Sequence, residues 1–136
     1  MVNTQRLEPT EWYQRGIVFD NQGQSQNAIA CYSKAIELQA DYYEAWVRQG
    51  LVLMLLQELT GAIASFNRAL ALSRELDLAW YLKAYCHMAT GAEELGRLAL
   101  RKALDLSPQQ WSSMACQEPL FEPLMNCPDF PELKGT

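Results

Sequence analysis

The stretch WVRQGLVLMLLQELTGAIASFNRALAL, residues 46–72, decides the fold, because its pattern of side chains recurs on both sides of it. Tryptophans stand at positions 12, 46 and 80, and the differences 46 − 12 and 80 − 46 both equal 34. The same shift aligns, without a gap, seven columns of matching size and character: Trp12/Trp46/Trp80, Gly16/Gly50/Ala84, Ala28/Ala62/Gly96, Tyr32/Phe66/Leu100, Ala35/Ala69/Ala103, Ile36/Leu70/Leu104 and Leu38/Leu72/Leu106. A period of this length predicts an array of stacked repeats.

The small residues of the pattern have a packing reason. A glycine or alanine four positions after each tryptophan lets two helices approach closely, since a larger side chain would hold the backbones apart. The ring of Tyr32 lies four positions after Ala28 and three before Ala35, so the three side chains share one helix face. Turn-prone residues such as Gly23 and Gly61 fall between the two helices. Each unit is therefore predicted to be a helix, a short turn and a helix.

The period places six helices. Inner helices are predicted at residues 10–22, 43–56 and 77–89, and outer helices at 25–38, 60–73 and 92–106. Asp77 is the predicted N-cap of the third inner helix.

Trp followed by Gly or Ala, then Ala, an aromatic residue, Ala and Pro108, on a 34-residue period, resembles the tetratricopeptide repeat. The resemblance covers about residues 9–110. It implies an all-α fold, a right-handed α-solenoid of three helix pairs, with a lead of residues 1–8, repeats at 9–42, 43–76 and 77–110, and a capping helix with a tail at 108–136, all in one domain. The chain departs from the family at positions where Leu, an aromatic residue or Pro is usual, namely Arg15, Gln49, Lys83, His87, Ala40 and Arg74.

The pattern changes after the third repeat. Ser107-Pro108-Gln109-Gln110 combines a capping hydroxyl, a first-turn proline and a glutamine at the third helical position, so a further helix is predicted here. Its apolar face would cap the array. Two proline-opened turns follow, at 118–124 and 128–133, and predict a folded tail packed on the last repeat. Whether residues 118–136 lie over the groove or only on that repeat stays open.

The inner helices of such an array line a concave groove, which is its usual ligand face. The residues predicted to line it are Tyr13, Ile17, Asp20, Val47, Arg48, Leu51, Met54, Leu78, Tyr81, Tyr85 and Met88. Most of these side chains are apolar, and a large apolar groove is unfavourable if it faces only water. Two interpretations follow: an apolar or amphipathic segment of a partner docks there, or the chain's own tail or a second copy covers it.

One class of partner is argued against. Tetratricopeptide co-chaperones of the heat-shock 70 and 90 type hold a C-terminal carboxylate with Lys, Asn and Arg side chains from their inner helices. The matching positions here are Tyr13, Ile17, Arg48, Leu78 and Leu82. Of these only Arg48 could donate to a carboxylate, and one donor does not make a clamp.

Composition narrows the functional classes. A net charge of −5 with 11 scattered Lys and Arg argues against nucleic acid as a partner. The longest apolar run, residues 51–56, is far shorter than the roughly 20 residues that cross a bilayer.

Four widely spaced cysteines predict reduced thiols in a cytoplasmic protein rather than a zinc site, with Cys116 and Cys127 as the one local pair. The single histidine, His87, is predicted to be structural, and neither a cofactor nor a reaction is expected.

These observations lead to a functional hypothesis. We expect a non-catalytic cytoplasmic adaptor or assembly factor that binds an apolar or amphipathic segment of another protein in its groove. The repeats also resemble those of short cyanobacterial proteins, a class that includes photosystem assembly factors. The alternative is a structural subunit or homodimer whose groove is covered.

Overall fold

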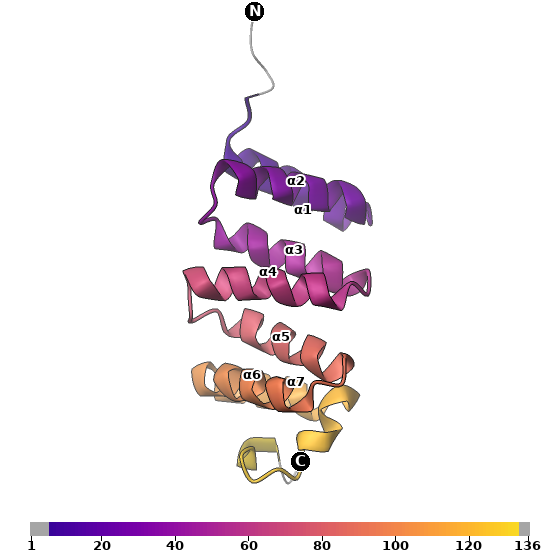
Figure 1. The fold of residues 1–136 in the computed structure, drawn as a ribbon, viewed down its shortest axis with the longest axis vertical. Coiled ribbons are helices and arrows are strands. Elements are labelled where there is room, and N and C mark those ends of the chain that lie inside the picture. The colour runs from indigo at the N-terminus through magenta and orange to yellow at the C-terminus, as the bar shows by residue number, and fades with distance from the viewer. Residues whose placement is uncertain (1–5, 134–136) are drawn as a thin grey trace, which may run out of the picture. The chain divides into compact units, whose positions relative to one another are not determined.

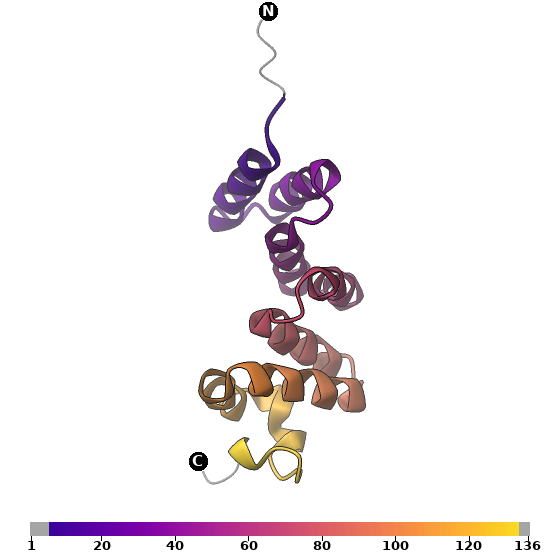
Figure 2. The same cartoon turned by 90° about the vertical axis from the view of Figure 1, so that its left-hand side faces the viewer.

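The computed structural model describes residues 6–133, and within them every regular element is a helix (Figures 1 and 2). The elements are α1 (Pro9–Asn21), α2 (Ser25–Leu38), α3 (Tyr43–Leu55), α4 (Leu59–Leu72), α5 (Asp77–Ala89), α6 (Glu93–Leu106), α7 (Pro108–Cys116) and the 3₁₀ helices η1 (Pro119–Leu124) and η2 (Pro131–Leu133). The six helices predicted from the period agree with α1–α6 to within one residue at each end. The predicted all-α repeat fold, with a capping helix and a short helical tail, is confirmed.

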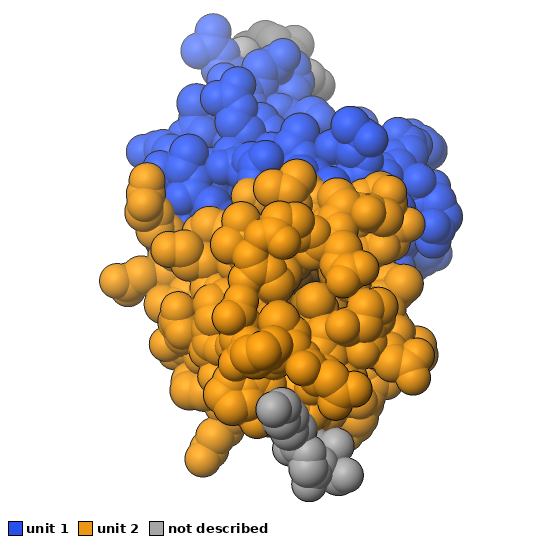
Figure 3. All heavy atoms as spheres, turned by 60° about the horizontal axis from the view of Figure 1, so that its bottom comes forward, with its two compact units in different colours: residues 1–73 blue, residues 74–136 orange. Residues whose placement is uncertain are grey.

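The chain divides into two compact units, residues 1–73 and 74–136 (Figure 3). In the first unit α1 packs against α2, α2 against α3, and α3 against α4. In the second unit α5 packs against α6 and α6 against α7, while η1 contacts both α5 and α7 and η2 contacts α7. The prediction of one domain stays a prediction.

A glycine fixes the closest contact within each of the first two helix pairs. A β-carbon at Gly50 would lie 2.6 Å from Cε1 of the Phe66 ring, and one at Gly16 would collide with the ring of Tyr32. Real β-carbons do not come this close to carbon, so only glycine allows the two helices of a pair to approach as they do. In the third pair the crowded glycine is Gly96, where a β-carbon would lie 2.6 Å from the sulfur of Met88.

The turn between the two helices of each pair repeats the same backbone conformation. Gly23, Gln57 and Gly91 are again 34 positions apart and have φ values of 75°, 65° and 85°. Each N–H at these positions, and the next one, donates back to the end of the preceding helix, as in Glu58 N–H to the Leu53 carbonyl at 2.9 Å. This is the Schellman arrangement, in which a left-handed residue ends the helix.

Two tryptophans bind the backbone of the connection that precedes their own helix. The indole N–H of Trp46 donates to the carbonyl of Ala40 (3.1 Å), and that of Trp80 donates to the carbonyl of Arg74 (2.9 Å). These acceptors are the two positions where the chain lacks the family's proline. The starts of α3 and α5 are thus tied to the connections that precede them.

Cations replace the leucine expected beside two of the tryptophans. The guanidinium of Arg15 lies 5.7 Å from the ring centre of Trp12, and the ammonium of Lys83 lies 5.1 Å from that of Trp80. A cation over an indole face is attracted to it, and its alkyl stem still packs against the ring. Two of the departures from the family pattern are therefore compatible with the same helix packing.

The glycine contact gives a test of the fold. Gly50→Ala should lower the free energy of unfolding by about 1–3 kcal/mol, because Phe66 or the backbone must move to admit the methyl group. Gly61→Ala is the matched control, because a β-carbon there would meet only Leu53 Cδ1 at an ordinary 3.4 Å. This change should raise stability by about 0.5–1 kcal/mol, since alanine favours a helix more than glycine does. Urea titration followed by circular dichroism measures both, and equal effects would contradict the packing described.

Candidate functional site

The inner face of the first two repeats is built on aromatic side chains. Tyr13 of α1 has its ring centre 5.9 Å from that of Tyr32 and 5.1 Å from that of Tyr42. Tyr13 and Ile17 are partly buried and pack against a core that includes Val52. These predicted groove residues therefore form a supported floor rather than freely moving side chains.

Polar groups gather on the same face. The Tyr32 hydroxyl donates to Asp20 Oδ2 at 3.3 Å, and burial, followed by the negative charge of Asp20, raises the pKa of Tyr32. The interaction of the Arg48 guanidinium with the Tyr13 hydroxyl raises the pKa of Arg48 against the opposing effect of burial. Asp20 and Arg48 thus accompany two tyrosines, and this face is more polar than the mostly apolar stripe that was predicted.

The α3 part of this face is apolar. Val47, Leu51 and Met54 recur at intervals of four and three, and all three are partly exposed. We call the surface formed by Tyr13, Ile17, Asp20, Val47, Arg48, Leu51 and Met54 the inner face of the first unit. Sequence reasoning did not include Tyr42, which precedes the second inner helix and carried no periodic signal.

On the corresponding face of the third repeat, the chain's own tail covers Tyr81. Tyr81 is only 5% exposed, because its ring stacks on Trp111 of α7 with centres 4.6 Å apart and meets the edge of Phe121 of η1 at 5.4 Å. Tyr85 and Met88 are partly buried, and Leu78 is 41% exposed. Tyr81 was predicted to line the groove, with coverage by the chain's own tail as one alternative, and in the structure it is a core residue of the second unit beneath that tail.

Four apolar tail residues are fully or almost fully buried, namely Phe121, Leu124, Phe130 and Leu133. Two arginines of α6 hold the last turn of the tail. Arg101 pairs with Glu132 at 2.6 Å and donates to the Asp129 carbonyl at 2.7 Å, while Arg97 pairs with the Asp129 carboxylate. The tail is therefore a folded part of the second unit.

Asp77 links the start of α5 to the start of α7. Its carboxylate accepts hydrogen bonds from the Ser107 hydroxyl (2.7 Å), the Trp111 indole N–H (2.9 Å) and the backbone N–H of Leu78 (3.0 Å). Two capping predictions were wrong in detail. Leu76, not Asp77, is the N-cap of α5, and the Ser107 hydroxyl makes no capping bond to α7. A carboxylate is a stronger acceptor than a neutral oxygen, so it captures both nearby donors.

The hydrogen bonds to Asp77 also change the pKa of its carboxyl group. Burial acts to raise the pKa of this carboxyl, but the hydrogen bonds from Ser107, Trp111 and the backbone outweigh burial, and the pKa is lowered from 3.8. A lowered pKa in the folded state contributes stability that is present above the unfolded value and is lost as pH falls through the folded value.

Asp77→Asn should therefore lower the free energy of unfolding by about 1–2 kcal/mol at pH 7, because the neutral amide is a weaker acceptor for three donors and the site is partly screened by water. The deficit should shrink as pH falls below 3.8, where the wild-type carboxyl also becomes protonated. Denaturant titration followed by tryptophan fluorescence, at pH 7 and again at a pH below 3.8, measures the difference in the free energy of unfolding. Exposed Asp41→Asn is the control, and a deficit independent of pH would contradict the assignment.

Burial disfavours the charged forms of Cys86 and His87. Cys31, Cys86, Cys116 and Cys127 are all free thiols, and no bridge joins Cys116 to Cys127. Burial raises the pKa of Cys86 to about 11, which disfavours the nucleophilic thiolate. His87 is 8% exposed, and burial, followed by the charge of Lys83, lowers its pKa. Within residues 6–133 no group of three His, Cys, Asp or Glu side chains could hold a metal ion.

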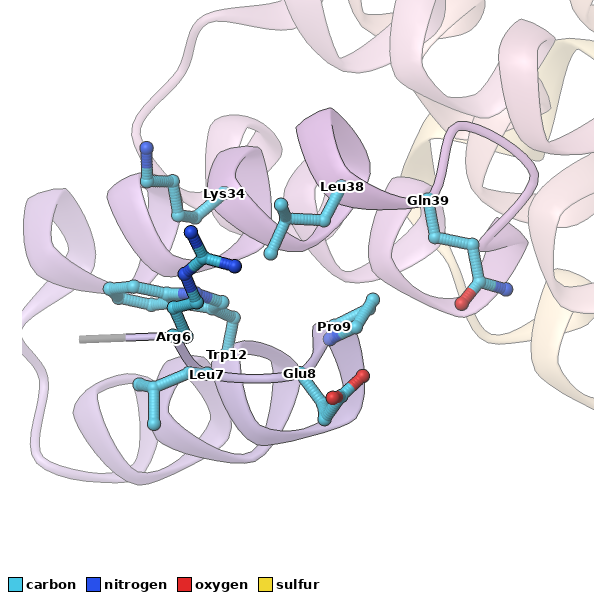
Figure 4. Close-up of a pocket in the computed structure, with 8 residues that line it drawn as sticks. All are labelled: Arg6, Leu7, Glu8, Pro9, Trp12, Lys34, Leu38 and Gln39. Atoms are coloured by element: carbon cyan, nitrogen blue, oxygen red, sulfur yellow. The ribbon is translucent and has the colours of Figure 1, made fainter. Parts of the chain in front are cut away.

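A cleft of about 650 Å³ lies at the start of the first unit (Figure 4). Its lining residues are Arg6, Leu7, Glu8, Pro9, Trp12, Lys34, Leu38 and Gln39. None of the predicted groove residues lines it, so this cleft is separate from the inner face of the first unit. Among residues 6–133, no helix combines the length and apolar character that crossing a bilayer requires.

The helix pairs, the 34-residue period and the left-handed turns define an all-α repeat protein. The tetratricopeptide repeat model matches residues 13–77, and a second model of the same description matches residues 78–110. The chain belongs to the tetratricopeptide repeat family. No curated protein matches the chain.

Several solved structures are similar to the chain. The first tetratricopeptide domain of Spaghetti (RPAP3), bound to the HSP90 peptide SRMEEVD, is 20% identical with a TM-score of 0.72, and the match covers 83% of this chain and 95% of that one. MamA from Desulfovibrio magneticus RS-1 is 27% identical with a TM-score of 0.73, covering 79% and 62%. YrrB, described as having an unusual peptide-binding site, is 22% identical with a TM-score of 0.74, covering 81% and 57%. The chain thus spans less than two thirds of MamA and YrrB.

Proposed function

We propose that the protein is a non-catalytic adaptor or assembly factor, which binds an apolar or amphipathic segment of another protein on the inner face of the first unit. The observation that carries the proposal is the contrast between the two units. Val47 is partly exposed beside a supported tyrosine floor, as are Leu51 and Met54, whereas Tyr81, which lies 34 positions after Val47, is covered by Trp111 and Phe121. The similar Spaghetti domain, which is bound to an HSP90 peptide, and YrrB, which has a peptide-binding site, support this class of function.

The polar groups of the inner face restrict the chemical kind of ligand that can bind there. Arg48 is already engaged by Tyr13, and Asp20 accepts the hydrogen bond of Tyr32. Leu82, one of the five positions matched to the co-chaperone clamp, is 8% exposed and buried in the second unit. We therefore propose a partner that presents apolar anchors, not a terminal carboxylate of the kind that heat-shock co-chaperones hold.

We also propose that the protein acts in the cytoplasm and needs no cofactor. Four unpaired thiols, two of them buried, suit a reducing compartment, where disulfides are rare. The alternative, a homodimer whose inner face is covered by a second copy, would use the same apolar residues of α3.

Leu51→Asp combined with Met54→Asp tests the inner face. Each apolar anchor buried on binding contributes on the order of 1.5–3 kcal/mol, so losing two should weaken binding at least about tenfold. Affinity capture from native lysate, followed by titration with synthetic peptides from the captured protein, measures the effect. The matched control is Val18→Asp with Leu55→Asp, which changes residues of α1 and α3 that are 54% and 68% exposed.

Equal peptide affinity for wild type and the Leu51/Met54 variant would contradict the proposal. Sedimentation of the wild type at several concentrations distinguishes the alternative. A dimer that the Leu51/Met54 double substitution dissociates would show that a second copy, not a partner, covers this face.

A further inference from the structure

A second groove lies between α5 and α6 in the second unit, with a volume of about 450 Å³. On the α5 side it is lined by Trp80, Lys83 and His87, which recur at intervals of three and four. On the α6 side Leu95, Leu98 and Lys102 form a matching stripe. We call these six residues the α5–α6 groove. None of them belongs to the predicted inner-face residues, so this surface is separate from the one assigned above.

The floor of the α5–α6 groove is unusually apolar for an outer surface. Leu95 and Leu98 are 53% and 50% exposed, whereas Leu100 and Leu104 of the same helix are fully buried. One set of leucines of α6 therefore packs in the core, and a second set is exposed to solvent. Adjacent exposed leucines beside a tryptophan form a patch of the kind that marks a contact with another molecule.

The rim of the groove is cationic. Within residues 6–133 neither Lys83 nor Lys102 takes part in an ion pair, whereas Arg101 at the edge is occupied by Asp105 and Glu132. Burial lowers the pKa of Lys83, so its ammonium would gain from a nearby carboxylate. Two uncompensated lysines around an apolar floor stand out in a chain of net charge −5. The charge pattern complements an acidic ligand.

The second repeat provides an internal comparison. Its equivalent groove, of about 520 Å³, is also lined by a tryptophan and by the outer helix. The 34-residue shift places Gly61 and Ala64 where the third repeat has its two exposed leucines, and Gln49 where it has Lys83. In the second repeat the same backbone frame therefore lacks the two exposed leucines and carries one cation, Arg68 at the position of Lys102, so repeat packing alone does not require Leu95, Leu98 and Lys83.

We propose that the α5–α6 groove is a docking site for an acidic amphipathic segment of a partner protein, whose aliphatic side chains contact Leu95 and Leu98 and whose carboxylates pair with Lys83 and Lys102. The site extends the proposed function by a second, charge-selective contact. A partner that combines this segment with the one bound on the inner face would be held at two places, and two linked contacts raise the overall affinity.

The test uses the full chain and a fluorescein-labelled peptide of about 15 residues, in which leucines recur every three and four positions and the remaining positions are mainly glutamate. We expect saturable binding by fluorescence anisotropy that weakens as salt rises from about 0.05 to about 0.5 M. Leu95→Ser with Leu98→Ser should weaken it at least about tenfold. Leu38→Ser with Leu55→Ser, at leucines that are 54% and 68% exposed in the first unit, should leave it unchanged.

Charge reversal provides a second test that does not depend on the leucines. Lys83→Glu with Lys102→Glu should abolish binding of the acidic peptide and create binding of a leucine/lysine peptide of the same pattern. Absence of saturable binding by the wild type, or equal binding by the Leu95/Leu98 variant, would overturn the proposal. So would a wild-type dimer in sedimentation that the Leu95/Leu98 variant dissociates, because the groove would then be a contact between copies. The Leu51/Met54 variant should bind this peptide normally, which separates this outcome from that of the inner-face test.

Discussion

The close approach of an aromatic ring to a glycine backbone is the constraint on which the rest of the structure depends. Phe66 rests where a β-carbon of Gly50 would lie, and Tyr32 does the same at Gly16. This contact sets the distance between the two helices of a pair, and the pair in turn fixes where the inner-helix side chains point. Tyr32 joins both roles, since its ring fills the pair and its hydroxyl reaches Asp20 on the inner face.

In the second unit, α7 and the tail cap the third repeat, and no fourth repeat follows it within the described residues. Trp111 uses its indole N–H as Trp46 and Trp80 do, but its acceptor is the Asp77 carboxylate instead of a backbone carbonyl. Its ring covers Tyr81, and the tail adds Phe121 on the other side. The cap therefore covers Tyr81 on the inner side of α5. It leaves the α5–α6 groove open.

The helices could be predicted well from the sequence, because the side chains that pack within each helix pair recur at a fixed spacing. The sequence could not predict that Tyr81 is buried, because this depends on Trp111 and Phe121, which lie outside the periodic part. The Asp77 hydrogen bonds were missed for the same reason, since Ser107 and Asp77 are 30 positions apart and each had a plausible local capping role. Among the predicted groove residues, Tyr13 and Ile17 were identified from helical spacing and Arg48 from its match to a co-chaperone clamp position. The tyrosines that contact them, on α2 and before α3, were not predicted as part of the groove.

The inner face is partly exposed throughout the first unit, whereas in the second unit the tail covers it at Tyr81. Hydroxyl-radical footprinting with mass spectrometry tests this difference directly, because tyrosine and tryptophan react according to their exposure. The structure predicts rapid labelling of Tyr13 and Tyr42, and protection of Tyr81 and Trp111, which are 5% and 2% exposed. Labelling of Tyr81 and Trp111 as fast as that of Tyr13 in the folded chain would contradict it.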